Sequence, residues 1–245
     1  LVGSEMCIRD RDNASPMTFT GTRTYILGTE NLIVIDPGPN SEAHLSSIMK
    51  YIGKRKVTDI LLTHSHIDHS PLSRQLKIET GARIIGFGSA DEARTSFMKK
   101  LSSSLDLGGE EGIDKDLALD KKVIDKQILN LNNYSIEVVH TPGHLSNHVC
   151  FSLKERQILF SGDHVMGWAT TLISPPDGDL GSFMNSLEKL SDREEMIYYP
   201  GHGKPLKEPR KMVLAQIKHR RDREKQILNS VSNISRTPAE IVDDV

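Results

Sequence analysis

Disulfide-forming cysteines, long apolar runs and an excess of either charge are scarce or missing in this sequence of 245 residues. The two cysteines, Cys7 and Cys150, are too few for a disulfide framework and are typical of a reducing compartment. Without an apolar run of about 18 residues or a basic-then-apolar leader, the sequence predicts neither a membrane partner nor export, so a cytoplasmic location is expected. Since 31 Lys and Arg residues face 33 Asp and Glu residues, no global positive field attracts polyanions.

Histidine, by contrast, is concentrated in one short stretch. Residues 63–69 read Thr-His-Ser-His-Ile-Asp-His and follow an apolar, strand-like run. Imidazole nitrogens suit zinc and similar divalent ions, and a carboxylate can complete the shell of a second ion. His64 and His66 stand two residues apart in a chain that leaves a strand, so both can point the same way. Asp68 and His69 follow where the chain turns into a helix, and the stretch therefore predicts a metal site that serves two ions.

At this stretch the sequence resembles the metallo-β-lactamase superfamily, whose signature is His-x-His-x-Asp-His behind a strand. The other blocks of that pattern follow in order in turns that contain glycine: Asp36 in Val-Ile-Asp-Pro-Gly, His144 in Thr-Pro-Gly-His, Asp163 in Ser-Gly-Asp-His, and His202 in Pro-Gly-His-Gly. The resemblance runs from about residue 13 into the C-terminal helix, and its finer pattern is similar to soluble hydrolases of the β-lactamase-like protein 2 type.

The resemblance and the order of strands and amphipathic helices predict an α/β fold. We expect a four-layer αββα sandwich with two mixed sheets face to face, helices outside, and the ligand loops at one edge. Residues 13–206 would form the catalytic domain, and residues 207–245 a truncated, winged-helix-like helical cap. Residues 1–12 read as a non-native leader that packs poorly, so that an edge strand of the family would be missing.

The resemblance also divides the candidate ligands into three groups. These are a histidine set for one ion (His64, His66, His144), a mixed set for the other (Asp68, His69, His202), and a bridging carboxylate (Asp163). Asp68 and Asp163 are also expected to act in catalysis.

Three further residues are expected beside the ions. Asp36 would accept a hydrogen bond from a liganding imidazole and so fix its tautomer. For His148, contact with substrate and packing behind the ligands both remain open. For Trp168, the single tryptophan, an apolar wall of the substrate pocket and a core-filling role under its loop both remain open.

The ligand types predict the metal and the reaction. Nitrogen and oxygen donors without thiolate suit zinc, with Mn²⁺ or Fe²⁺ as alternatives. Redox di-iron members of the family that the sequence resembles carry an acidic residue at the position of His66, and its β-lactamases usually lack an aspartate at the position of Asp163. Oxygen reduction and antibiotic hydrolysis are therefore disfavoured. Two neighbouring ions lower the pKa of a shared water from about 15.7 towards about 7, so we expect a dinuclear metal-dependent hydrolase that uses a metal-bridging hydroxide.

Three functions remain open. The favoured one is hydrolysis of a small acyl substrate, a thioester or lactone, because the net charge is only −2 and residues 175–178 (Pro-Pro-Asp-Gly) would stiffen one edge of a preformed pocket. The second is a single-strand-specific endoribonuclease, which the resemblance and a basic C-terminal helix support. The third is an inactive metal-binding scaffold. The expected partner is thus a small acyl molecule or RNA, and the oligomeric state is not predicted.

The sequence leaves the role of two segments open. Residues 101–133 are rich in serine, glycine and charge, and either a solvated insertion or a mobile flap that contacts substrate is compatible with them. The basic residues of the helix expected after Pro209 are compatible with a solvated face or with a docking surface for RNA or a carrier protein.

Overall fold

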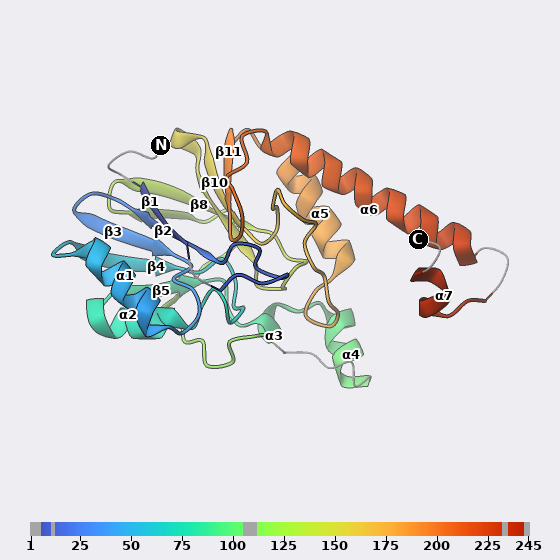
Figure 1. Cartoon of the computed structure of the whole chain (residues 1–245), viewed down its shortest axis with the longest axis horizontal. Helices are drawn as coiled ribbons and strands as arrows, with labels where there is room; N and C mark the ends of the chain where they lie inside the picture. Colours follow the sequence, from blue (N-terminus) through green and yellow to red (C-terminus); the bar gives the residue numbers. More distant parts are fainter. Residues whose placement is uncertain (1–5, 11–12, 105–111, 232–234, 243–245) are drawn as a thin grey trace.

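The computed structural model describes residues 6–10, 13–104, 112–231 and 235–242, which form two β-sheets with helices on both outer faces (Figure 1). The first sheet contains, in spatial order, β1 (Met6–Asp10), β2 (Arg23–Leu27), β3 (Asn31–Ile35), β4 (Lys56–Leu61), β5 (Arg83–Gly86) and β6 (Lys121–Lys122). The second contains β11 (Ile197–Pro200), β10 (Ile158–Gly162), β9 (Val149–Leu153), β8 (Tyr134–His140) and β7 (Ile128–Leu131).

Both sheets are mixed. In the first, β2 is antiparallel to both of its neighbours, β1 and β3, whereas β3 to β6 are parallel. In the second, β7 to β10 are antiparallel and β11 runs parallel to β10. Side chains alternate between faces, so Tyr25 and Ile35 pack against Phe151 and Phe160 between the sheets. The inter-sheet layer is therefore a continuous apolar core.

The helices are α1 (Glu42–Ile52), α2 (Leu72–Thr80), α3 (Ala90–Ala93), α4 (Ser96–Ser104), α5 (Leu180–Ser191), α6 (Pro209–Val231) and α7 (Pro238–Val242), with a 3₁₀ turn η1 (Lys154–Arg156). Helices α1 and α2 cover the outer face of the first sheet, and α5 and α6 cover that of the second (Figure 1). This arrangement confirms the predicted four-layer αββα sandwich. Among the described helices, none combines the length and apolar character needed to cross a membrane.

The expectation that residues 1–12 pack poorly is wrong for Met6–Asp10, which form strand β1 along the free edge of β2. Met6 and Ile8 face the inter-sheet core while Cys7 packs on the helix side, which is the alternation of a half-buried strand. β1 thus occupies the edge that the sequence analysis expected to be empty. Residues 1–5 and 11–12 lie outside the described residues, and the proposed domain boundaries stay predictions.

The described part of residues 101–133 packs into the fold. β6 and β7 each extend a sheet, and residues 112–114 run beside the histidine loop, where Ile67 N donates to Gly112 O and Asp114 N donates to Ser65 O, both at 2.8 Å. Asp114 is also held by Ser70 Oγ at 2.8 Å. A purely solvated insertion is therefore wrong for residues 112–133; residues 105–111 lie outside the described part.

The segment from residue 90 to residue 104 forms two helices rather than one. α3 ends at Ala93 because Arg94 has an extended backbone (ψ 142°), and α4 begins at Ser96. Arg94 instead turns inward, where its guanidinium pairs with Asp91 and Asp177.

Candidate metal centre

Seven side chains from four separate loops meet at one edge of the sandwich. They come from the loop after β4 (His64, His66, Asp68, His69), the loop after β8 (His144), the turn after β10 (Asp163) and the turn after β11 (His202). Backbone hydrogen bonds join these loops directly, since Val149 N donates to Thr63 O and Gly201 N donates to Gly162 O, both at 2.8 Å. The loops are therefore held by the sheets rather than by side chains alone.

The first group of ring nitrogens is a histidine set. His66 Nδ1 lies 3.0 Å from His64 Nε2 and 3.0 Å from His144 Nε2. Burial is the largest cause that lowers the pKa of each ring, well below the usual value for His64 and to about 3 for His66. All three imidazoles are therefore neutral at pH 7, and their facing lone pairs fit a cation between them.

The second group combines two histidines with a carboxylate. His202 Nε2 lies 3.2 Å from Asp68 Oδ2 and 3.4 Å from His69 Nε2. Burial opposes protonation of both rings, but the neighbouring carboxylates outweigh it, so the pKa of His69 is well above its usual value and that of His202 is raised to about 9. The carboxylates thus favour positive charge at this point, which a divalent ion would supply in place of protons.

Asp163 lies between the two groups. Its Oδ2 is 3.7 Å from His144 Nε2 and 3.2 Å from His202 Nε2, and its Oδ1 is 3.4 Å from His69 Nε2. Oδ1 is buried and makes no hydrogen bond within the described part of the chain. Such an atom is costly without a partner, and a bound cation would satisfy it, so the donor set fits two divalent ions with Asp163 between them.

Asp36 and Thr63 orient two of the imidazoles. Asp36 Oδ2 lies 3.0 Å from His69 Nδ1 and accepts a hydrogen bond from Thr63 Oγ1 at 2.6 Å, while Asp36 Oδ1 accepts from Thr63 N at 2.8 Å. Because the Thr63 hydroxyl donates to Asp36, it accepts from His64 Nδ1, 2.9 Å away. Both rings are thereby left with Nε2 as the free nitrogen, which is the tautomer a metal needs.

His148 and His144 are held in different ways. His148 Nε2 accepts the backbone N–H of Asp163 at 3.2 Å, and its Nδ1 lies 2.8 Å from Thr141 Oγ1. His148 is fully buried and absent from the cavity lining, which favours packing behind the ligands over contact with substrate. His144 Nδ1 instead donates to the carbonyl of Leu172 at 2.7 Å. Sequence reasoning missed Leu172, because any residue type can contribute a backbone carbonyl.

A cavity of about 620 Å³ opens onto the candidate ligands. Trp168 and Leu172 line it together with Met17, Ile67 and Met166, and the Trp168 ring stacks on Phe19 with centroids 5.0 Å apart. This position favours the wall interpretation of Trp168. Among the described lining residues there is no Lys or Arg, so the cavity combines apolar walls with a polar, metal-binding floor.

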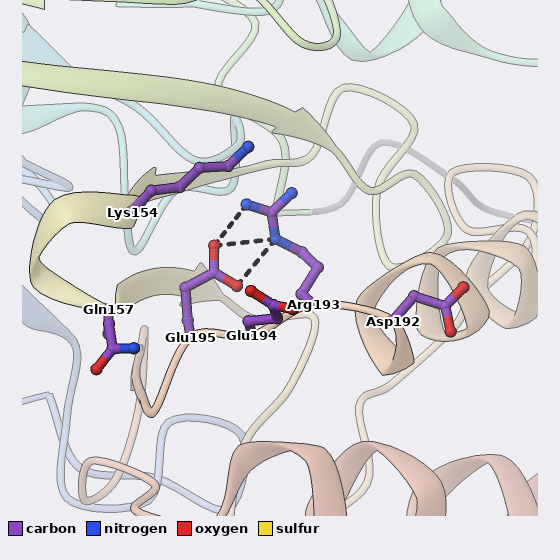
Figure 2. Close-up of a pocket in the computed structure, with 6 residues that line it drawn as sticks. All are labelled: Lys154, Gln157, Asp192, Arg193, Glu194 and Glu195. Carbon is purple, nitrogen blue, oxygen red and sulfur yellow. Dashed lines mark hydrogen bonds and ion pairs between the residues drawn. The ribbon is translucent and has the colours of Figure 1, made fainter.

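Figure 2 shows a second pocket, of about 300 Å³, at the opposite ends of β10 and β11. Here Arg193 points towards Glu195, with Nε–Oε distances of 3.0 Å, and also bonds to Glu137. Lys154 pairs with Glu137 at 2.9 Å. These charges satisfy one another and include no histidine, so the pocket is the surface of an ion-pair network that holds the segment before β11 (residues 193–195) to Glu137 of β8.

The sequence profile of the Metallo-beta-lactamase superfamily matches residues 17–202, so the chain belongs to that superfamily. Two curated relatives are similar to it. A beta-lactamase-like protein 2 homolog of Drosophila melanogaster is 35% identical over 226 residues, which cover 88% of this chain and 70% of the fly protein. An atrochrysone carboxyl ACP thioesterase of Aspergillus fumigatus is 29% identical over 239 residues, which cover 94% of this chain and 66% of the fungal protein.

A solved structure is similar in fold. The crystal structure of a metallo-beta-lactamase family protein from Thermus thermophilus gives a TM-score of 0.78 at 22% identity, and the match covers 94% of this chain and 84% of that one. The chain spans between 60% and 70% of the length of the curated relatives that it matches.

Proposed function

We propose that this protein is a metal-dependent hydrolase of small apolar acyl substrates, thioesters or lactones, with two divalent ions, most simply Zn²⁺, at the candidate centre. The observation that carries the proposal is the convergence of neutral imidazoles and buried carboxylates on the floor of an apolar-walled cavity. A relative named as a carboxyl ACP thioesterase supports acyl chemistry.

Each part of the candidate site has a separate role in the proposed hydrolysis. Two divalent ions would act as Lewis acids and supply an activated water at neutral pH. Asp163 keeps the two ligand groups together, because its oxygens face both. Asp68 lines the cavity; burial opposes its ionisation, but His69 and His202 lower its pKa to about 2, so it stays ionised and can orient an incoming water. Met166, Trp168 and Leu172 would hold the acyl group and exclude bulk water.

The placement of charged side chains supports the endoribonuclease hypothesis less than it supports acyl hydrolysis. Three of the basic side chains of α6 form ion pairs with acidic neighbours: Lys211 with Glu208, Lys218 with Asp222, and Arg221 with Glu188. A single-strand binding groove would need cationic and stacking groups that track a backbone, whereas the cavity lining has acidic groups and histidines. The pairs on α6 favour a solvated charged face over a docking surface.

The substrate test compares three chemistries in one preparation. The protein loaded with zinc or manganese is assayed against acyl-thioesters, lactones and labelled single-stranded RNA. We expect turnover of a thioester or lactone, and a loss of at least about 100-fold in Asp163→Ala and His66→Ala, because each variant removes a group that binds or joins the ions. His219→Ala, which changes an exposed histidine of α6, should keep wild-type turnover.

The outcomes separate the hypotheses. RNA cleavage that disappears in Asp163→Ala, with no turnover of thioester or lactone, would replace the acyl proposal by the ribonuclease. Two bound ions per chain with no turnover of any substrate would favour the scaffold. Elemental analysis gives the metal count, for which we expect two ions in the wild type and fewer in His66→Ala.

A further inference from the structure

Helix α6 contacts the loop between Asp163 and α5 at two points. Gln216 Nε2 donates to the carbonyl of Met166 at 3.0 Å, and Arg220 Nη2 donates to the carbonyl of Thr171. Gln216 and Arg220 are four residues apart, so they lie on the same face of the helix. Two consecutive turns of α6 thus hold two backbone carbonyls of this loop.

Arg220 differs from the basic residues around it. Its guanidinium lies 5.6 Å from the centroid of the Phe183 ring in α5, and partial burial lowers its pKa. Its neighbour Arg221 is 62% exposed and pairs with Glu188 on the surface. A half-buried cation that donates to a backbone carbonyl is costly to keep without a structural role. The position of Arg220 is therefore specific to the loop it holds.

The segment that Arg220 holds contacts two candidate ligands. Thr171 Oγ1 donates to the carbonyl of Asp163 at 2.7 Å. The next residue, Leu172, accepts the Nδ1 hydrogen of His144 at 2.7 Å, which leaves His144 Nε2 directed at the metal position. One dipeptide therefore bonds to the backbone of the bridging aspartate and to the ring of a histidine of the first set. Movement of this dipeptide would misplace both ligands together.

We propose that Arg220 and Gln216 are positioning residues of the metal centre, and that α6 fixes the ligand geometry by holding the backbone of residues 166–172. Neither residue touches the cavity or the reacting atoms. The inference rests on the proposed metal site but not on the proposed acyl substrate.

Trp168 makes the inference directly measurable. It is the only tryptophan in the chain and lies between the two carbonyls that α6 holds. Its fluorescence therefore reports on this loop without a second tryptophan. The variants are Arg220→Met, which keeps an unbranched apolar stem and removes the donors, Arg220→Lys, which keeps the charge, and Gln216→Met. Arg221→Met is the matched control, since it removes an adjacent, exposed arginine from the same helix.

The measurements are the emission maximum and acrylamide quenching of the metal-free and zinc-loaded proteins, and zinc affinity by chelator competition. In Arg220→Met we expect red-shifted emission, stronger quenching and a loss of about tenfold in zinc affinity, with unchanged far-UV circular dichroism. Arg220→Lys should recover part of each change, and Gln216→Met should change each in the same direction.

The proposal is overturned if Arg220→Met and Gln216→Met both retain wild-type emission and zinc affinity, or if Arg221→Met changes them equally. Should Arg220→Met not fold, Gln216→Met and Arg220→Lys decide the outcome by the same readouts. Neither measurement involves substrate. A failure of thioester turnover with these shifts present would therefore count against the proposed function alone.

Discussion

Asp36 combines an unusual backbone with three hydrogen-bond donors around its carboxylate. Its φ of 48° lies in the left-handed region, which Asp and Asn tolerate better than most residues. Asp36→Asn should therefore keep the backbone conformation. It replaces one acceptor oxygen by an NH₂ group, which cannot accept the hydrogen bonds from Thr63 and His69. We expect a loss of about 1–3 kcal/mol in the free energy of unfolding and of about 10–100-fold in zinc affinity, because His69 loses its orienting partner.

Chemical denaturation and chelator competition measure these two losses. Asp116→Asn, at an exposed position of the same charge, should leave both values unchanged. Wild-type zinc affinity in Asp36→Asn would show that the carboxylate does not orient a ligand.

Gly201 leaves the space in which two ligands meet. A Cβ at this position would lie 2.2 Å from Asp163 Oδ1 and 2.6 Å from His69 Cε1. We expect Gly201→Ala to displace both side chains and to lower the metal content measured by elemental analysis. Gly181→Ala is the control, because its Cβ would meet only Asp179 Oδ1 at 3.4 Å and helix α5 favours alanine. Full metal content in Gly201→Ala would contradict the predicted ligand arrangement.

Side chains of the candidate site could be predicted from the sequence, whereas backbone groups that position them could not. The histidines and aspartates stand in short blocks after strands, and the structure brings all seven of them together; their roles as ligands stay predictions. The backbone carbonyls of Thr171 and Leu172 could not be predicted, because every residue type has such a group. Arg220 appeared in the sequence as one basic residue among several, because its burial depends on how α6 packs on α5.

At the scale of elements, the segment that leads into β11 is tied to β8, because Arg193 bonds to both Glu195 and Glu137. Burial opposes ionisation of Glu195, but hydrogen bonds from Arg193 and Ser152 outweigh it and hold the pKa of Glu195 below its usual value of 4.5. A carboxyl group with a lowered folded pKa adds stability that is fully present above its unfolded pKa. That stability is lost as the pH falls through the folded value.

We therefore expect Glu195→Gln to lower the free energy of unfolding at pH 7 by about 1–3 kcal/mol, and the difference from wild type to narrow below pH 4.5. Urea titrations of metal-free protein between neutral and acidic pH measure that difference. Glu194→Gln, at the exposed neighbouring position, should show no such loss. A difference that stays constant down to the lowest pH would argue against an ionised Glu195 in this network.

Elements with a strong hydrophobic period were predictable, and short or edge elements were not. In α1, Ile48 and Ile52 are buried at helical spacing, and Ser41 caps the helix by accepting a hydrogen bond from His44 N; both signals are visible in the sequence. β1 was overlooked because five residues carry too little periodicity to reveal a strand before its partner is known. The break between α3 and α4 depends on the pairing of Arg94 with Asp177, a residue 83 positions away.

For the whole molecule, the position of β1 leads to a prediction about association. Among the described strands, β1 pairs only with β2 and closes one edge of the first sheet. A shortened chain that begins at Asn13 would leave the outer backbone groups of β2 without partners, and its apolar residues Tyr25 and Leu27 would be more exposed. We expect light scattering to detect larger, concentration-dependent species than for the full chain. Equal scattering from both chains would contradict this expectation.

The pairing of β1 with β2 also limits how far the N-terminus of this protein can be truncated. The superfamily profile begins at residue 17 and the first motif block at Val34, so a boundary chosen from them alone would treat Met6–Asp10 as dispensable. An exposed strand edge is a template on which other chains, including amyloid-like ones, can grow. We therefore expect Met6–Asp10 to limit edge-to-edge association of this sheet, although they belong to no catalytic motif.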